Sequence, residues 1–219
     1  MELLLAAFGV TVNPPAVITS IVLVASSRHR AVAFAAGWMT GLLLVGSAAM
    51  LLGDLMAELS GEPSMVILAA KLVAGIALIA LGVSQWLKHR GPSAEKETPA
   101  WIRSLDDIAA PRAFLIAAAY AALNPKTVAL VIAGALTIIE ASLGVAAEWA
   151  VLVFFVLIAS LTVTVPVAFA FVAPERSAES LVSARRWLSD NGSVLTAAVL
   201  GVLGVVLMRS GITGLAQLI

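Results

Sequence analysis

The sequence predicts an all-α integral membrane protein with six transmembrane helices, arranged as two inverted three-helix repeats with broken helices one and four. The chain is 61% apolar and only 12% charged, whereas about a quarter of the residues in an average soluble domain are charged. Its apolar residues fall into six stretches, each long enough to cross a bilayer, which takes about 20 helical residues. An Asn-Pro pair interrupts the first and the fourth stretch, at Asn13 and Asn124. Such a matched pair of interrupted helices is typical of inverted repeats.

The six predicted spans divide the chain into two halves and a central linker. The spans cover residues 3–25, 32–53, 65–87, 113–139, 146–171 and 193–217. We expect a first repeat over 1–87, a cytoplasmic linker over 88–112 and a second repeat over 113–219. The first span should be retained rather than cleaved as a signal peptide, because Glu2 is its only early charge and two prolines interrupt its apolar core.

The charges between the spans predict the orientation of the chain. Basic residues follow the first, third and fifth spans: Arg28, Arg30, Lys88, Arg90, Lys96, Arg103, Arg112, Arg176, Arg185 and Arg186. The other two connections carry acidic charges: Asp54, Glu58, Glu62, Glu140 and Glu148. Because loops rich in lysine and arginine stay in the cytoplasm, both termini are expected on the extracytoplasmic side of the cell membrane. Interfacial tryptophans are expected at the cytoplasmic side (Trp38, Trp86, Trp101 and Trp187) and at the outer side (Trp149).

Two cytoplasmic connections each contain a segment with an apolar face. In the linker, Trp101, Leu105 and Ile108 fall on one face of a predicted short amphipathic helix. The connection around Trp187, after the fifth span, repeats this pattern. Each is read as a solvated connector with an aromatic residue at the interface, and the alternative is a gate or a lipid-headgroup contact.

Small residues in two spans predict close helix packing. Gly37 and Gly41 form a Gly-x-x-x-Gly pattern in the second span, and Gly201 with Gly204 thins part of the sixth. Small residues let membrane helices approach closely. We expect this packing within one monomer, and a homodimer seam is the alternative.

The two Asn-Pro breaks predict a binding site near the bilayer midplane. Asparagine caps a new helix and proline fits its first position, so helices should restart at Pro14-Pro15 and at Pro125. Both restarts would offer their amino ends, with unpaired N–H groups and partial positive charge, at the midplane from opposite leaflets. The alternative is two ordinary kinks whose carbonyls are satisfied by neighbours such as Thr11 and Thr127.

Two lysines lie within predicted spans. An unpaired ammonium at the bilayer centre costs about 3 kcal/mol or more, so Lys126 should be neutral, hydrated or held for a bound anion, and the alternative is a structural lysine on backbone carbonyls. Lys71 should extend outward toward Glu58 or Glu62, and the alternative is a second anion contact on an exit path.

The fifth span contains the hydroxyl residues Ser160, Thr162 and Thr164, and Pro166 is expected to bend it. These hydroxyls either line a polar cavity or bond to their own helix. The predicted substrate-binding residues are therefore Thr11, Asn13, Pro14, Pro15, Lys71, Asn124, Pro125, Lys126, Thr127 and Thr164.

Several classes of function find no support in the sequence. His29 and His89 stand alone, so no metal-ligand spacing and no cofactor motif is present, and no catalytic nucleophile motif occurs. Cysteine is absent and the formal net charge is zero, which removes thiol chemistry and any bulk attraction to nucleic acid. The absence of a midplane carboxylate argues against a conventional proton relay.

Three stretches resemble a known family. They are residues 71–86 (KLVAGIALIALGVSQW), 99–107 (PAWIRSLDD) and 121–130 (AALNPKTVAL). The chain resembles the lysine-exporter (LysE-type) superfamily, and most closely its sulfolipid- and glycopeptidolipid-addressing (Sap/GAP) family. It departs from many relatives at Asn13, where they have serine, and at Thr127, where asparagine is common. The resemblance implies Asn124-Pro125-Lys126 as the central motif, with Pro14 as its partner in the first span.

The resemblance implies export of cell-envelope material, and the residues leave alternatives open. The leading hypothesis is a transporter or flippase-like exporter of an anionic or amphipathic envelope metabolite, with membrane lipids and envelope-lipid biosynthesis proteins as partners. The chain is then not an enzyme. The alternatives are an enzyme that passes an acyl or phosphoryl group across the bilayer, an amino-acid exporter, and an accessory scaffold.

Overall fold

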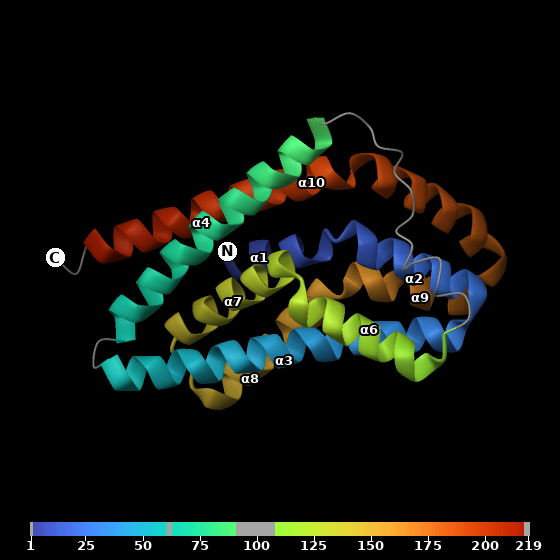
Figure 1. Cartoon of the computed structure of the whole chain (residues 1–219). Coiled ribbons are helices and arrows are strands. Elements are labelled where there is room, and N and C mark those ends of the chain that lie inside the picture. Colours follow the sequence, from blue (N-terminus) through green and yellow to red (C-terminus); the bar gives the residue numbers. More distant parts are fainter. Residues whose placement is uncertain (1, 61–62, 91–107, 217–219) are drawn as a thin grey trace.

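The described part of the chain is entirely helical. The computed structural model describes residues 2–60, 63–90 and 108–216, and every regular element in these ranges is an α-helix (Figure 1). The helices are α1 (Glu2–Thr11), α2 (Pro14–Ser26), α3 (Arg28–Ser60), α4 (Pro63–Arg90), α6 (Ala110–Leu123), α7 (Pro125–Glu140), α8 (Val145–Ala159), α9 (Leu161–Val172) and α10 (Pro174–Ala216).

Three single helices and three bent helix pairs have the length and composition of membrane spans. The single helices contain the apolar stretches Arg28–Met56, Leu68–Leu87 and Asp190–Gly214. The bent pairs are α1 with α2, α6 with α7 and α8 with α9, at angles of 50°, 68° and 63°. If each pair is one span, the described residues cross the membrane up to six times. The structure is therefore that of an all-helical membrane protein, and the predicted interruption at Asn13 and Asn124 is confirmed.

Both predicted breaks have the same local cause. Asn13 Oδ1 accepts a hydrogen bond from the Ala16 backbone N–H at 3.5 Å, and Pro14 begins α2. Asn124 Oδ1 accepts from the backbone N–H groups of Lys126 and Thr127, at 3.0 and 3.3 Å. Each asparagine caps the helix that follows it, and each proline takes the first helical position, where a missing N–H costs nothing.

The third bend was placed wrongly by the sequence. Pro166 was expected to bend the fifth span, but it lies inside α9, and the break falls six residues earlier at Ser160. Ser160 stays in the right-handed helical region (φ −93°, ψ −5°) and caps α8 through its backbone N–H. Pro166 is the sixth residue of α9, beyond the first turn in which proline is tolerated, so α9 lacks the hydrogen bond that an N–H at this position would donate to the Thr162 carbonyl.

The connection after the fifth span is also different from the expectation. It was predicted as a solvated connector, but α10 begins at Pro174 and runs without interruption to Ala216. A helix of 43 residues is about 65 Å long, well beyond the roughly 30 Å of hydrocarbon in a bilayer. The segment around Trp187 is therefore the first part of α10. The amphipathic helix predicted around Trp101 and Leu105 lies outside the described residues.

Glycines set how closely the helices pack. Cβ atoms at Gly37 and Gly41 of α3 would clash with the carbonyl oxygens of Phe114 and Ala118 of α6, the second at 2.5 Å. A Cβ at Gly204 of α10 would lie 2.9 Å from the Gly75 carbonyl oxygen of α4. Figure 1 shows α4 and α10 crossing along one side of the molecule. The Gly-x-x-x-Gly pattern thus packs two helices of one monomer, as expected.

The core formed by these contacts contains one tryptophan that was expected at the interface. Trp38 is fully buried on α3, with its ring centroid 5.9 Å from that of Tyr120 on α6. The close α3–α6 approach encloses this side chain, so it cannot reach a headgroup layer. Trp86 and Trp187 are exposed, as interfacial residues would be.

Substitution of Gly37 by alanine should destabilise the protein, because the new Cβ must push the α6 backbone away. Overpacking of this kind costs about 1–3 kcal/mol. Gly201→Ala is the matched control, because a Cβ at Gly201 has nothing within 4 Å. Thermal unfolding in detergent should show a lower midpoint for Gly37→Ala alone. Equal midpoints for the two variants would contradict the α3–α6 packing.

Candidate functional site

The two Asn-Pro breaks meet in the interior of the molecule. Asn13 Nδ2 donates to Thr127 Oγ1 at 3.3 Å, across 114 residues of sequence. Asn13 is 2% exposed and Thr127 is fully buried. The hydroxyl of Tyr120, on α6 before the second break, donates to Asn13 Oδ1 at 3.2 Å. The N-cap of α2 and the first turn of α7 are therefore held together by side chains of the breaks themselves.

Lys126 joins the same contact from α7. Its side chain is only 8% exposed, and its ammonium donates to the backbone carbonyl of Val12. Val12 follows the last residue of α1, where the helix dipole is negative and carbonyls lack intrahelical partners. A cation at this end is favourable, and a buried ammonium needs an acceptor. The lysine thus holds the carboxyl end of α1 against the amino end of α7, which is the structural alternative considered for it.

The N–H donors of both restarted helices are occupied as well. The Asn13 side chain accepts from Ala16, and the Asn124 side chain accepts from Lys126 and Thr127. An anion at this site would therefore have to compete with an asparagine oxygen for backbone N–H groups or with the Val12 carbonyl for the ammonium. Of these, the exchange at Lys126 gives the larger gain, because a carboxylate or phosphate forms a stronger hydrogen bond with an ammonium than a neutral carbonyl does.

The third helix break contacts the first. Thr162 Oγ1, in the first turn of α9, donates to the Thr11 carbonyl at the end of α1 at 2.6 Å. On the other side of the break in the first span, Ser20 Oγ of α2 donates to the Val163 carbonyl at 2.8 Å. The end of α1 is thus held by Lys126 from α7 and by Thr162 from α9. Three interrupted helices converge on one short stretch, residues 11–13.

Two fully buried polar groups near this convergence have no hydrogen-bond partner among the described residues. They are Ser160 Oγ, at the third break itself, and Trp38 Nε1, on the ring that packs against Tyr120. Most buried side-chain polar atoms in proteins are paired, which sets these two groups apart from the other buried polar side chains of the described residues. Both groups are available for a ligand or a water molecule at the breaks.

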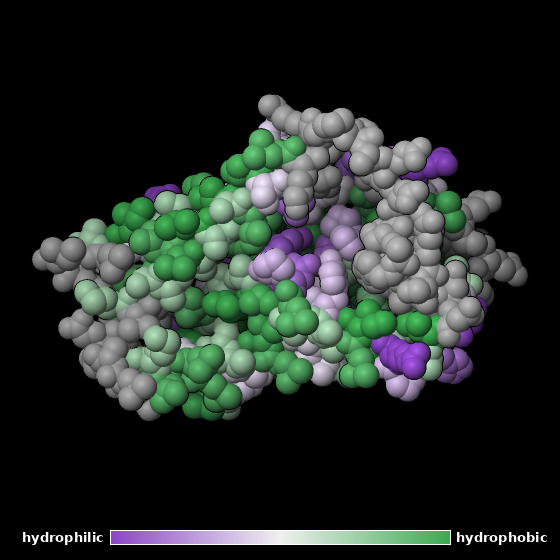
Figure 2. Space-filling view, viewed as in Figure 1, coloured by the Kyte–Doolittle hydropathy of each residue, from purple (hydrophilic) through white to green (hydrophobic). Residues whose placement is uncertain are grey.

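One side of the convergence reaches the molecular surface. Leu123 is 78% exposed, Pro125 is exposed and Asn124 is half-buried. Figure 2 shows hydrophilic residues gathered in a depression of an otherwise largely hydrophobic face, where α6 meets α7 in Figure 1. The break between α6 and α7 therefore interrupts the apolar exterior of the molecule.

The predicted site residues separate into two groups. Thr11, Asn13, Pro14, Pro15, Asn124, Pro125, Lys126 and Thr127 all belong to the converging breaks. Thr164 does not join them, because its hydroxyl donates to the Ser160 and Leu161 carbonyls of its own chain segment, at 3.0 and 3.4 Å. Tyr120 was not considered from the sequence. A tyrosine one helical turn before the Asn-Pro pair was the only available signal.

Lys71 forms a second polar cluster, with two partners that the sequence analysis did not name. Its side chain is fully buried on α4 and pairs with Glu2 Oε2 of α1 at 3.1 Å and with Glu140 Oε2 of α7. It was expected to reach toward Glu58 or Glu62. The side chains of Glu58 and Glu62 lie outside the described part of the structure, and the fold brings the first turn of α1 and the last turn of α7 beside α4. Thr137 Oγ1 also donates to Glu2 Oε2, at 3.4 Å.

The described residues offer no group of three or more His, Cys, Asp or Glu side chains that could hold a metal ion. The chemistry available at the converging breaks is therefore binding by one ammonium, several hydroxyls, two amides and an indole N–H.

A comparison with protein-family models matches residues 3–213 to the family described as Sap, sulfolipid-1-addressing protein. The comparisons with curated proteins and with solved structures gave no match.

Thr162→Val should weaken the junction of α1 and α9, because it keeps the shape of the side chain and removes the hydrogen bond to the Thr11 carbonyl. Interhelical hydrogen bonds in membrane proteins are worth about 0.6–1.7 kcal/mol, so the unfolding free energy in detergent should fall by this amount. Thr164→Val is the matched control, because its hydroxyl bonds locally. A larger loss in the control would contradict the assignment.

Proposed function

The chain belongs to the Sap, sulfolipid-1-addressing protein, family, and on this basis we propose that it exports or flips an anionic or amphipathic metabolite of the cell envelope. Membership of this family associates the chain with lipid and envelope transport at the level of the family. The substrate is proposed to be a glycolipid or one of its building groups. The all-helical membrane fold, with apolar side chains over most of its exterior, supports a transport function within the membrane.

The observation that carries the proposal is the convergence of helix breaks around Lys126. Irregular backbone is tolerated at membrane depth only where it is buried in protein or lines a cavity. In transporters, paired interrupted helices provide polar groups and helix ends for substrate at the centre of the membrane. Here the breaks contribute an ammonium, two amides and the unpaired Ser160 hydroxyl, and the Trp38 ring packs beside Tyr120.

The proposed transport step begins with exchange at Lys126. The anionic group of the substrate replaces the Val12 carbonyl as the acceptor for the ammonium, which frees the end of α1. Because Thr162 and Asn13 hold the same stretch, its release changes how α1 and α2 pack on α7 and α9. In this step the half-helices of each bent pair tilt relative to each other about the break that joins them.

The finer topology belongs to the same proposal. We propose six crossings in two inverted repeats, with both termini outside the cytoplasm and the basic connections inside, in the cell membrane. The chain is then a transporter of the LysE type rather than an enzyme. The Lys126 ammonium and the Thr162 hydroxyl both donate to backbone carbonyls, and neither donates to a side chain that could act as a general base. Membrane lipids and proteins of envelope-lipid biosynthesis are its proposed partners, and a homodimer is compatible with this topology.

Lys126→Gln should reduce export by about tenfold or more, because a hydrogen bond to a charged group is worth about 1.5–3 kcal/mol. The measurement is the rate at which a fluorescent lipid with an anionic headgroup crosses the bilayer of proteoliposomes that contain the purified protein. Lys126→Arg keeps the charge and should retain more activity than Lys126→Gln.

The control for this experiment is Arg112→Gln, an exposed charge at the start of α6, which should export as the unmodified protein does. Protein content and unfolding midpoint are compared in each preparation. Unchanged flux in a correctly folded Lys126→Gln protein would rule out the central role of this lysine.

A further inference from the structure

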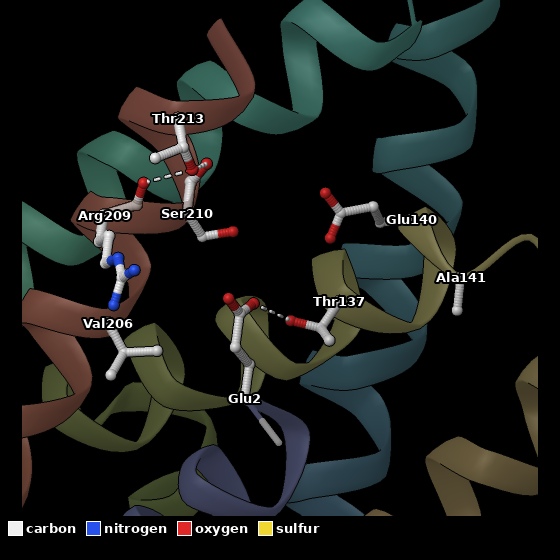
Figure 3. A pocket seen from close by; sticks show the side chains of 8 residues that line it. All are labelled: Glu2, Thr137, Glu140, Ala141, Val206, Arg209, Ser210 and Thr213. Atoms are coloured by element: carbon white, nitrogen blue, oxygen red, sulfur yellow. Dashed lines mark hydrogen bonds between the residues drawn. The ribbon is translucent and has the colours of Figure 1, made fainter. Parts of the chain in front are cut away.

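A polar cavity lies at the opposite end of α1 from the helix breaks. It has a volume of about 630 Å³ and lies between α10 and the ends of α1 and α7 (Figure 3). Its polar lining residues are Glu2, Thr137, Glu140, Arg209, Ser210 and Thr213. Only 12% of the chain is charged, so three charged side chains around one cavity are a strong local concentration. The converging breaks contribute none of these residues.

One wall of the cavity carries an excess of negative charge. Glu2 and Glu140 both bind the buried ammonium of Lys71 through Oε2, which leaves Oε1 of each carboxylate for another donor. The side chains of Glu2 and Glu140 are 22% and 43% exposed. One lysine between two carboxylates gives this wall a net charge of minus one. Figure 3 shows both carboxylates pointing into the space between α7 and α10.

The opposite wall carries a positive charge that this acidic wall does not neutralise. Arg209 projects from α10, lines the same cavity and has no salt bridge to any described residue. Ser210, its neighbour, directs its hydroxyl into the same space (Figure 3). Opposite charges thus line one cavity without meeting, and both Glu140 and Arg209 are exposed and accessible to a ligand.

The acidic wall and the basic wall together favour a ligand that carries one positive and one negative group. A simple cation would leave Arg209 without a partner, and a simple anion would leave the surplus carboxylate without one. We propose that the cavity binds a zwitterionic headgroup, with its primary ammonium at Glu2 and Glu140 and its phosphate or carboxylate at Arg209. The ammonium supplies three donors to two carboxylates, and the guanidinium fork matches a phosphate or carboxylate with two parallel hydrogen bonds. The proposal does not rest on transport through the helix breaks.

The test measures lipid-dependent stability of the purified full-length protein in nanodiscs. Addition of phosphatidylethanolamine to phosphatidylcholine nanodiscs should raise the unfolding midpoint, because a ligand that binds only the folded state stabilises it. Phosphatidylcholine is the built-in control, since its quaternary ammonium has no N–H to donate. Phosphatidylglycerol, which is anionic and carries no ammonium, should not substitute for phosphatidylethanolamine.

Two variants locate the effect in the cavity. Glu140→Gln keeps the Lys71–Glu2 pair and removes the surplus negative charge, and Arg209→Gln removes the positive wall. Each should weaken the apparent affinity for phosphatidylethanolamine by about tenfold, because a hydrogen bond to a charged group is worth about 1.5–3 kcal/mol. Glu148→Gln and Arg112→Gln are matched controls outside the cavity. Lys126→Gln should respond as the unmodified protein does, which separates this site from the helix breaks.

A soluble headgroup distinguishes the source of the ligand. If phosphoethanolamine alone raises the midpoint, headgroup chemistry is sufficient, and if only phosphatidylethanolamine does so, the ligand is a membrane lipid. Either result supports the proposal. Equal stabilisation by phosphatidylglycerol, or an unchanged response in both Glu140→Gln and Arg209→Gln, would overturn it. Should Arg209→Gln fail to fold, Arg209→Lys retains the charge, and the discrimination among the three lipids by the unmodified protein decides the outcome.

Discussion

The contact between the Lys126 ammonium and the Val12 carbonyl is the interaction on which the central architecture depends. A membrane protein cannot leave either group unpaired in the hydrocarbon region, because no water is available to satisfy it. The lysine sits in the first turn of α7 and the carbonyl just beyond the end of α1. Their pairing gives the buried ammonium an acceptor and gives the carbonyl at the end of α1 a donor. Asn13 and Thr162 then hold the same stretch with weaker hydrogen bonds.

The two Asn-Pro breaks could be predicted from the sequence because their cause is local. A proline removes a backbone donor, and the asparagine before it supplies the cap, so both helix ends follow from adjacent residues. The six apolar stretches could be predicted for the same kind of reason, since length and composition decide them. That the breaks meet was inferred from their matched positions, and the structure shows the contact directly between Asn13 and Thr127.

The remaining parts of the site depend on contacts between distant segments. Nothing near Ser160 in the sequence indicates a helix break, because its backbone stays in the right-handed region and no proline follows immediately. The pairing of Lys71 with Glu2 and Glu140 could not be predicted, because it depends on the packing of α1 and α7 against α4. Trp38 was assigned to the interface on composition, and only the close packing of α3 on α6 shows that it is enclosed.

The ion pairs of Lys71 restrain α1 and α7, the two half-helices that carry Glu2 and Glu140. α1 and α7 are joined at the helix breaks by Lys126 and again at their far ends, where Glu2 and Glu140 both bind one ammonium from α4. Two helices that are joined at both ends in this way resist sliding past each other and resist separating at one end alone.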